Sequence, residues 1–143
     1  MNDKRKILLI EDNKDDQMLT IRAFKKNGIV NEIKVIGDGE EAMDFLFGEE
    51  KNELPQLILL DLKLPKVEGL EVLKKIRETK RTRRLPVVVL TSSKDESDLI
   101  KSYDLGCNSY IQKPVKFDEF LEAVHQLGLY WLLLNQLPPL NGD

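Results

Sequence analysis

The sequence predicts an α/β fold, an open and doubly wound parallel sheet of five strands covered by five helices. Short apolar runs alternate with segments of helical period, which is typical of βαβ units. Two of the runs, 57–60 and 87–90, are continuously apolar, as expected for central strands covered on both faces. The length of 143 residues fits one domain.

In chain order, acids, glycine or proline bound the predicted strands, which lie at 7–10, 33–36, 57–60, 86–90 and 109–111. The helical patterns between them lie at 15–27, 40–47, 69–79, 95–105 and 117–134. Right-handed crossovers favour the flavodoxin-like strand order 2-1-3-4-5. Ligands in such sheets bind at the carboxyl ends of the strands, so functional residues are expected there. The polar segment 48–56 is long for a connection and is predicted to be a solvated loop.

Composition excludes several classes of protein. The 22 Lys and Arg against 25 Asp and Glu leave a net charge of −3, which gives no reason to expect a nucleic-acid partner. The basic stretch 80–84 lacks interleaved aromatics and is interpreted as a solvated loop. The one cysteine, Cys107, suits a reducing compartment. The apolar run 7–10 is shorter than the about 7–15 residues of a secretory signal, so a cytoplasmic location is expected.

Polar residues follow four of the predicted strands. Glu11 and Asp12 follow the first, Asp61 the third, Thr91 with two further serines the fourth, and Lys113 the fifth. Because the carboxyl ends of parallel strands meet at one edge, three carboxylates, a hydroxyl and an amine are expected in one pocket.

The chemistry of such a pocket points to a metal ion and a phosphoryl group. Carboxylates about 4 Å apart repel by roughly 4 kcal/mol per pair at an effective dielectric near 20, so they need a cation or raised pKa values. Oxygen ligands without His or Cys suit Mg²⁺. The amine of Lys113 and the hydroxyl of Thr91 can hold phosphate oxygens, so the set fits phosphoryl transfer to a carboxylate.

Each of these residues also has an ordinary structural interpretation. Asp12 or Asn13 could cap the next helix, Thr91 could be a turn hydroxyl, and Lys113 could be a solvated lysine. Their joint occurrence at four strand ends favours a site over chance placement.

The sequence resembles the receiver domain of two-component response regulators over residues 6 to about 126. The residues that carry the resemblance are ILLIED (7–12), LILLDLKLPKVEG (57–69), VVVLTS (87–92) and GCNSYIQKP (106–114). Order and spacing both match, so the domain expected over residues 1–126 is a receiver.

The resemblance implies a role for each strand-end residue. Asp61 would accept a phosphoryl group from the phosphohistidine of a sensor histidine kinase or phosphotransfer protein. Asp12, Asp61 and the backbone carbonyl of Lys63 would coordinate Mg²⁺, or Mn²⁺ in its place, and Glu11 would act through a metal-bound water. Thr91 would bond the new phosphate and Lys113 would pair with it.

Three further features follow from the same resemblance. Tyr110 would rotate inward as Thr91 moves, although from the residues alone its ring is an ordinary packed strand side chain. Lys63 and Ser93 occupy positions that tune the lifetime of the aspartyl phosphate. Lys113–Pro114 would be a cis peptide.

The apolar segment 127–143 is expected to extend the last helix. Its six consecutive large apolar side chains at 129–134 are too few to span a membrane, which needs about 20. Such a segment either folds back on its own domain or forms an interface. We expect a homodimer interface, built on Leu129, Tyr130, Trp131 and Leu133. The tail, the stretch SYIQKP (109–114) and the extended loop after Phe47 resemble the stand-alone receivers that serve bacterial phytochrome photoreceptor kinases.

The functional hypothesis is therefore a phosphorylated signalling module with weak autophosphatase activity, and not an enzyme that acts on a metabolite. A haloacid-dehalogenase-type phosphatase also uses a strand-end Asp and Mg²⁺, but it needs an acid two residues later, where this chain has Lys63. A phosphate-independent scaffold would not need the full set of acids, Thr91 and Lys113. The lone His125 is interpreted as a partly buried helix residue and not as a phosphodonor.

Overall fold

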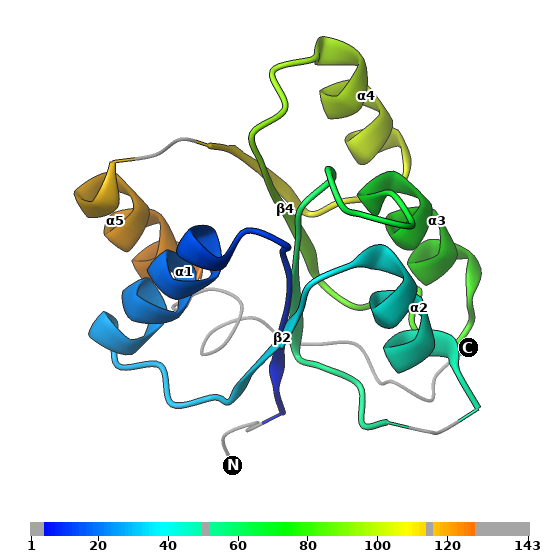
Figure 1. Ribbon diagram of the computed structural model, residues 1–143, viewed down its shortest axis with the longest axis horizontal. Coiled ribbons are helices and arrows are strands. Elements are labelled where there is room, and N and C mark those ends of the chain that lie inside the picture. Colours follow the sequence, from blue (N-terminus) through cyan, green and yellow to red (C-terminus); the bar gives the residue numbers. More distant parts are fainter. Residues whose placement is uncertain (1–4, 50–51, 114–115, 128–143) are drawn as a thin grey trace.

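The sheet has the predicted topology. The structure, a computed structural model, describes residues 5–49, 52–113 and 116–127. Five parallel strands lie in the order β2-β1-β3-β4-β5, which confirms the predicted fold (Figure 1). The strands are β1 (Ile7–Ile10), β2 (Ile33–Ile36), β3 (Leu57–Leu60), β4 (Val87–Thr91) and β5 (Ser109–Gln112).

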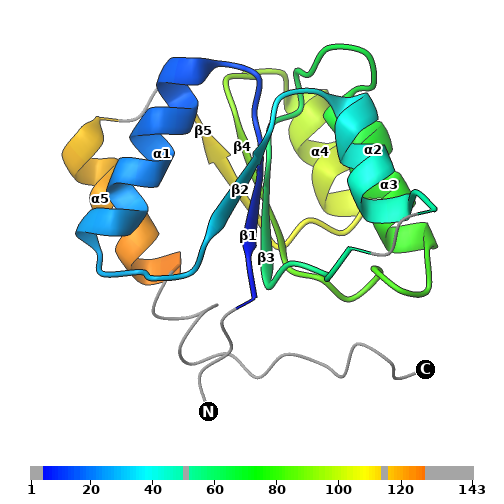
Figure 2. The same ribbon diagram turned by 60° about the horizontal axis from the view of Figure 1, so that its bottom comes forward.

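Helices cover both faces of this sheet, as Figure 2 shows, with α1 and α5 on one side and α2, α3 and α4 on the other. Their bounds are α1 (Lys14–Lys26), α2 (Gly39–Phe47), α3 (Gly69–Glu78), α4 (Glu96–Asp104) and α5 (Phe117–Leu127). The starts and ends lie within one residue of the prediction, except at α5, where the predicted residues 128–134 fall outside the described part. β4 runs one residue further than predicted because the Lys113 N–H donates to the Thr91 carbonyl oxygen at 2.7 Å.

The core consists of two apolar layers, one on each face of the sheet. Alternate residues of β1 and β3 supply them: Leu8, Ile10, Ile58 and Leu60 face α2 and α3, whereas Ile7, Leu9, Leu57 and Leu59 face α1 and α5. All residues of β1, β3 and β4 are buried. The packing of these buried strands therefore holds in place the residues that follow their carboxyl ends.

Two predictions about exposure hold only in part, and a third is wrong. The segment predicted as a solvated loop ends in buried residues, because Leu54 packs into the core and Gln56 accepts a hydrogen bond from Asn31 Nδ2 at 3.0 Å. Within the basic stretch, Thr82 is fully buried and donates to the Ile76 carbonyl at 2.7 Å. His125 is exposed, because it lies on the solvent side of α5.

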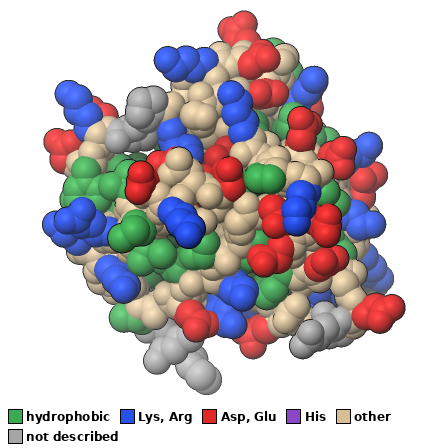
Figure 3. All heavy atoms as spheres, in the orientation of Figure 1, with side chains coloured by type: hydrophobic (Ala, Val, Ile, Leu, Met, Phe, Trp, Pro, Cys, Tyr) green, Lys and Arg blue, Asp and Glu red, His purple; other side chains and the backbone are tan. Residues whose placement is uncertain are grey.

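The surface mixes charges of both signs. Figure 3 shows Lys, Arg, Asp and Glu side chains interspersed on this face, with hydrophobic side chains over α1 and α5. In the part of the chain that the structure describes, no helix has the length and apolar character to cross a membrane.

Candidate functional site

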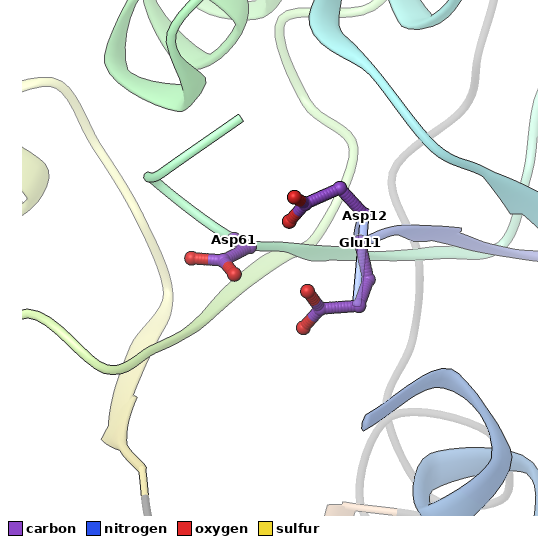
Figure 4. Close-up of side chains that lie close together, drawn as sticks. All are labelled: Glu11, Asp12 and Asp61. Atoms are coloured by element: carbon purple, nitrogen blue, oxygen red, sulfur yellow. The ribbon is translucent and has the colours of Figure 1, made fainter. Parts of the chain in front are cut away.

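Three acids meet at the carboxyl ends of β1 and β3. These strands pair with Ile10 opposite Leu60, so Glu11 and Asp61 follow neighbouring positions of the sheet. A backbone hydrogen bond also fixes the position of Asp61, whose N–H donates to the Ile10 carbonyl at 3.0 Å. Carboxylate oxygens of Glu11, Asp12 and Asp61 lie within 4.8 Å of one another and face a common space (Figure 4). The acids therefore form a candidate site for a hard divalent cation.

The three carboxylates differ in their contact with water. Glu11 is 2% exposed and Asp61 is 5% exposed, whereas Asp12 is exposed. Burial raises the pKa of Glu11 to about 7, against the opposing hydrogen bond from Lys113. The N–H of Lys63 donates to Asp61 Oδ1 at 3.1 Å, while the rest of Lys63 is exposed. Asn13 is the N-cap of α1, because its Oδ1 accepts the Asp16 N–H at 3.0 Å.

Lys113 brings a positive charge to these acids from the end of β5. Its Nζ lies 2.6 Å from Glu11 Oε1, 2.8 Å from Asp16 Oδ2 and 3.4 Å from Asp61 Oδ2. Burial alone would lower the pKa of Lys113, but the hydrogen bonds to Asp16 and Glu11 and the charge of Asp61 outweigh it and raise that pKa. The lysine stays charged at every physiological pH.

The hydroxyl side of the site lies on β4 and the segment after it. Thr91 is fully buried, and its Oγ1 accepts the Ser93 N–H at 3.3 Å. Ser93 donates through Oγ to Asp98 Oδ2 at 2.6 Å, and the hydroxyl of half-buried Tyr110 lies 3.5 Å from the Ser93 carbonyl oxygen. Thr91, Ser93 and Tyr110 are thus connected through one short stretch of backbone.

A glycine allows the loop after Asp61 to close tightly. Gly69 begins α3, and its N–H donates to the Leu62 carbonyl at 2.9 Å. A Cβ at this position would lie 2.3 Å from the Asp61 carbonyl oxygen and 2.6 Å from Leu62 Cα. Only glycine leaves room for α3 to start directly against the residue that carries the central carboxylate.

Two residues near the site were missed at the sequence level, Asp16 and Asp98. Both are acids in the first turn of a helix, α1 and α4, where negative side chains are common for a different reason, the positive end of the helix. The signal that could have identified Asp16 is its place at the start of the helix directly after β1. A long lysine at the end of β5 can reach such a residue only if α1 and β5 are close.

Some predicted features lie outside the described residues. These are Pro114, and with it the predicted cis peptide, and the interface residues Leu129, Tyr130, Trp131 and Leu133.

The chain is similar to proteins of known family. A sequence model described as "Response regulator receiver domain" matches residues 7–125. The response regulator Rcp1 of Synechocystis sp. (strain ATCC 27184 / PCC 6803 / Kazusa) is 41% identical over 140 residues, 96% of this chain and 95% of that protein. "Probable methanogenesis regulatory protein FilR2" of Methanothrix harundinacea (strain 6Ac) is 43% identical over 134 residues, 92% of this chain and 86% of that protein.

Two solved structures are similar over nearly their whole length. The Mn²⁺-bound form of Rcp1 has a TM-score of 0.85 and 39% identity, covering 94% of this chain and 99% of that one. The phosphorylated cyanobacterial phytochrome response regulator RcpA has a TM-score of 0.87 and 39% identity, covering 96% and 100%. One of these relatives thus carries a divalent metal and the other a phosphoryl group.

Proposed function

Because this chain belongs to the response regulator receiver family and is related to phytochrome response regulators, we propose that it accepts a phosphoryl group on Asp61 from a sensor histidine kinase. The observation that carries the proposal is the position of Asp61. Its carboxylate is nearly buried, lies among the acids that could hold a cation, and faces the ammonium of Lys113 at 3.4 Å.

The arrangement supports transfer by positioning and charge neutralisation. A carboxylate oxygen of Asp61 forms the new O–P bond while the N–P bond of a phosphohistidine breaks, and the imidazole nitrogen keeps that electron pair. The N–H of Lys63 holds the other Asp61 oxygen, which fixes the orientation of the nucleophile. Lys113 then offers a donor to the phosphoryl oxygens.

A divalent cation, Mg²⁺ or Mn²⁺, would supply the remaining positive charge. Asp12, Asp61 and the backbone carbonyl of Lys63 would be its protein ligands. Both oxygens of Glu11 are already engaged, one by Lys113 and one by the Asn13 N–H at 3.1 Å. This supports a role for Glu11 through a water rather than as a direct ligand.

We assign the hydroxyl side of the site to signalling. Thr91 would bond the phosphoryl group, which would withdraw its Oγ1 from the Ser93 N–H. Because Tyr110 contacts the same stretch of backbone, that movement would change the position of its ring. Ser93 and the exposed side chain of Lys63 would set how fast water reaches the phosphoryl group, and hence a weak autophosphatase activity.

The partner proposal follows the relatives. Two relatives favour a phytochrome-type kinase as the donor: the cyanobacterial phytochrome response regulator RcpA and the bacteriophytochrome response regulator RtBRR, whose structure is 48% identical to this chain. We propose that residues 1–126 form the receiver and that the apolar residues after it join two copies. A cytoplasmic location fits the single buried cysteine, Cys107.

The proposal is tested by phosphorylation with acetyl phosphate and Mg²⁺, followed by intact-protein mass spectrometry. One added phosphoryl group is expected on the wild-type chain and none on Asp61→Asn. The label should be released by hydroxylamine, as an acyl phosphate is. Asp44→Asn is the matched control, because Asp44 is exposed on α2 and should not alter labelling. A label that remains on Asp61→Asn would remove Asp61 from this role.

A further inference from the structure

The ammonium of Lys113 is shared unequally among three carboxylates. It lies nearest to Glu11 (2.6 Å) and Asp16 (2.8 Å), and furthest from the proposed phosphoacceptor Asp61 (3.4 Å). An ammonium group has three N–H donors, so these contacts use all of them. A phosphoryl oxygen could bond Lys113 only if one of these contacts lengthens or breaks.

The two nearer partners are not equally able to release the lysine. The Glu11 side chain is 2% exposed, so its carboxylate has no water to replace the lost partner. The Asp16 side chain is 34% exposed and can exchange the ammonium for water. The contact with Asp16 is therefore the cheaper one to break, because a buried charge left without a partner is strongly disfavoured.

The surroundings of Asp16 make its bond with Lys113 more than a surface ion pair. Both side chains line one cavity of about 220 Å³, together with apolar side chains of α1, β4 and α5, namely Leu19, Leu90 and Phe120. Apolar walls reduce screening by water and salt, so the bond is stronger than its exposure alone suggests. The helix also fixes Asp16, because its N–H is bound by the Asn13 cap.

We propose that Asp16 is a positioning residue that holds Lys113 toward α1 and thereby slows phosphorylation of Asp61. The proposal rests on the proposed function of Asp61. Asp16 stabilises the unphosphorylated site, in which Lys113 is its partner, and it places a negative charge beside the path of an anionic phosphoryl group. After transfer, Lys113 bonds the phosphoryl oxygens and Asp16 turns to water.

Two rate constants separate this role from a general effect on the fold. Full-length protein is incubated with acetyl phosphate and Mg²⁺, and the phosphorylated mass is followed over time. The donor is then removed and the loss of the phosphoryl group is followed. Asp16→Asn is expected to raise the phosphorylation rate constant about threefold to tenfold, the range for losing one partly shielded ion pair. The rate constant for loss should change by less than about twofold, because the Asp16 contact is already absent in the phosphorylated state.

Matched variants separate the contact with Lys113 from net charge. Asp15→Asn removes the same charge from the same first turn of α1, but Asp15 is exposed, and we expect wild-type rates. Asp16→Glu keeps a carboxylate that can reach Lys113 and should restore rates close to those of wild type. Asp16→Ser is a second removal of the carboxylate, should Asp16→Asn fold poorly.

The outcomes distinguish the inference from the function on which it rests. A wild-type chain that takes no label would overturn the proposed function and this role together. If the wild type is labelled but the Asp16 variants are no faster, or are slower, only the role of Asp16 is overturned. Equal acceleration in Asp15→Asn would also overturn it, because net charge would then explain the effect.

Discussion

Lys113 Nζ lies 2.6 Å from Glu11 Oε1, although 102 positions separate the two residues in the sequence. The contact ties the end of β5 to the end of β1 across the sheet. A proton and a divalent cation compete for the same Glu11 carboxylate. Burial raises the pKa of Glu11 to about 7, and Glu11 belongs to the cluster that would hold the cation.

Mg²⁺ affinity is therefore expected to fall as the pH decreases below about 7. A protonated Glu11 loses its attraction for the cation, so protons and metal compete for the site. The apparent Kd for Mg²⁺ should rise by up to about tenfold per pH unit below the pKa, since one proton is exchanged. Without metal, the free energy of unfolding depends on pH in the opposite direction. A carboxyl group whose pKa is raised on folding stabilises the fold at low pH, and this contribution is lost as the pH rises through about 7.

The measurement is Mg²⁺ titration by calorimetry at pH 6 to 8. Glu11→Gln is the control, because it cannot be deprotonated and should bind Mg²⁺ weakly with little pH dependence. An apparent Kd that is the same at pH 6 and pH 8 in the wild type would contradict the prediction.

Gly69→Ala should disturb the site without changing any polar side chain in it. The added Cβ would meet the Asp61 carbonyl oxygen at 2.3 Å, so either α3 or the backbone of Asp61 must move. We expect a loss of about 1–3 kcal/mol in the free energy of unfolding, the usual cost of forced overpacking, and weaker Mg²⁺ binding. Gly37→Ala is a fair control, because a Cβ at Gly37 meets no atom within 4 Å. Urea unfolding and Mg²⁺ titration of both variants test this, and equal behaviour would contradict it.

The residues that could be predicted from the sequence are those that the sheet itself places. Once strands are parallel and in the order 2-1-3-4-5, Glu11, Asp61 and Lys113 must emerge at one edge, and the apolar runs show where each strand ends. Asp16 could not be predicted in the same way. Its place depends on how α1 packs against the sheet and on how far the Lys113 side chain reaches, and neither leaves a periodic pattern in the sequence.

The same limit explains the errors about exposure. Thr82 lies in a basic stretch after α3. Nothing in the neighbouring sequence indicates that its hydroxyl donates to the carbonyl of Ile76 in the helix. Leu54 lies in a polar loop, yet it joins the core on the face of the sheet that α2 and α3 cover, and only the assembled fold defines that space. Local composition predicted solvent for both, and tertiary packing decided otherwise.

If the proposed dimer forms, removal of the apolar segment after residue 126 should leave a monomer. The run of six large apolar side chains at 129–134 would be stabilised by burial against a second copy. Analytical ultracentrifugation of the full chain and of residues 1–126 measures this directly. Full-length Trp131→Glu is the companion variant, because it keeps the chain length and places a charge in the proposed interface. Identical oligomeric states for all three proteins would contradict the prediction.

Arg77 offers a test of stability at the amino-terminal ends of the strands, opposite the candidate site. It is on α3 and donates to the carbonyls of Gly106 (2.8 Å) and Leu85 (2.8 Å) and to Asn108 Oδ1 (3.1 Å), so it joins the segments that lead into β4 and β5. Arg77→Ala should lower the free energy of unfolding by about 2–3 kcal/mol. Hydrogen bonds from a charged group are lost, and their acceptors lose this donor.

Arg77→Lys should not rescue this loss, since a single ammonium cannot reach acceptors that the planar guanidinium spans. Lys74→Ala, an exposed change on the same helix, should be close to neutral. Because Leu85 and Asn108 lie before β4 and β5, at the amino ends of these strands, the phosphorylation rate of folded Arg77→Ala should match that of wild type. Urea unfolding and acetyl phosphate labelling measure the two effects separately. A variant that keeps wild-type stability, or that folds normally but labels slowly, would show that Arg77 does something other than join these segments.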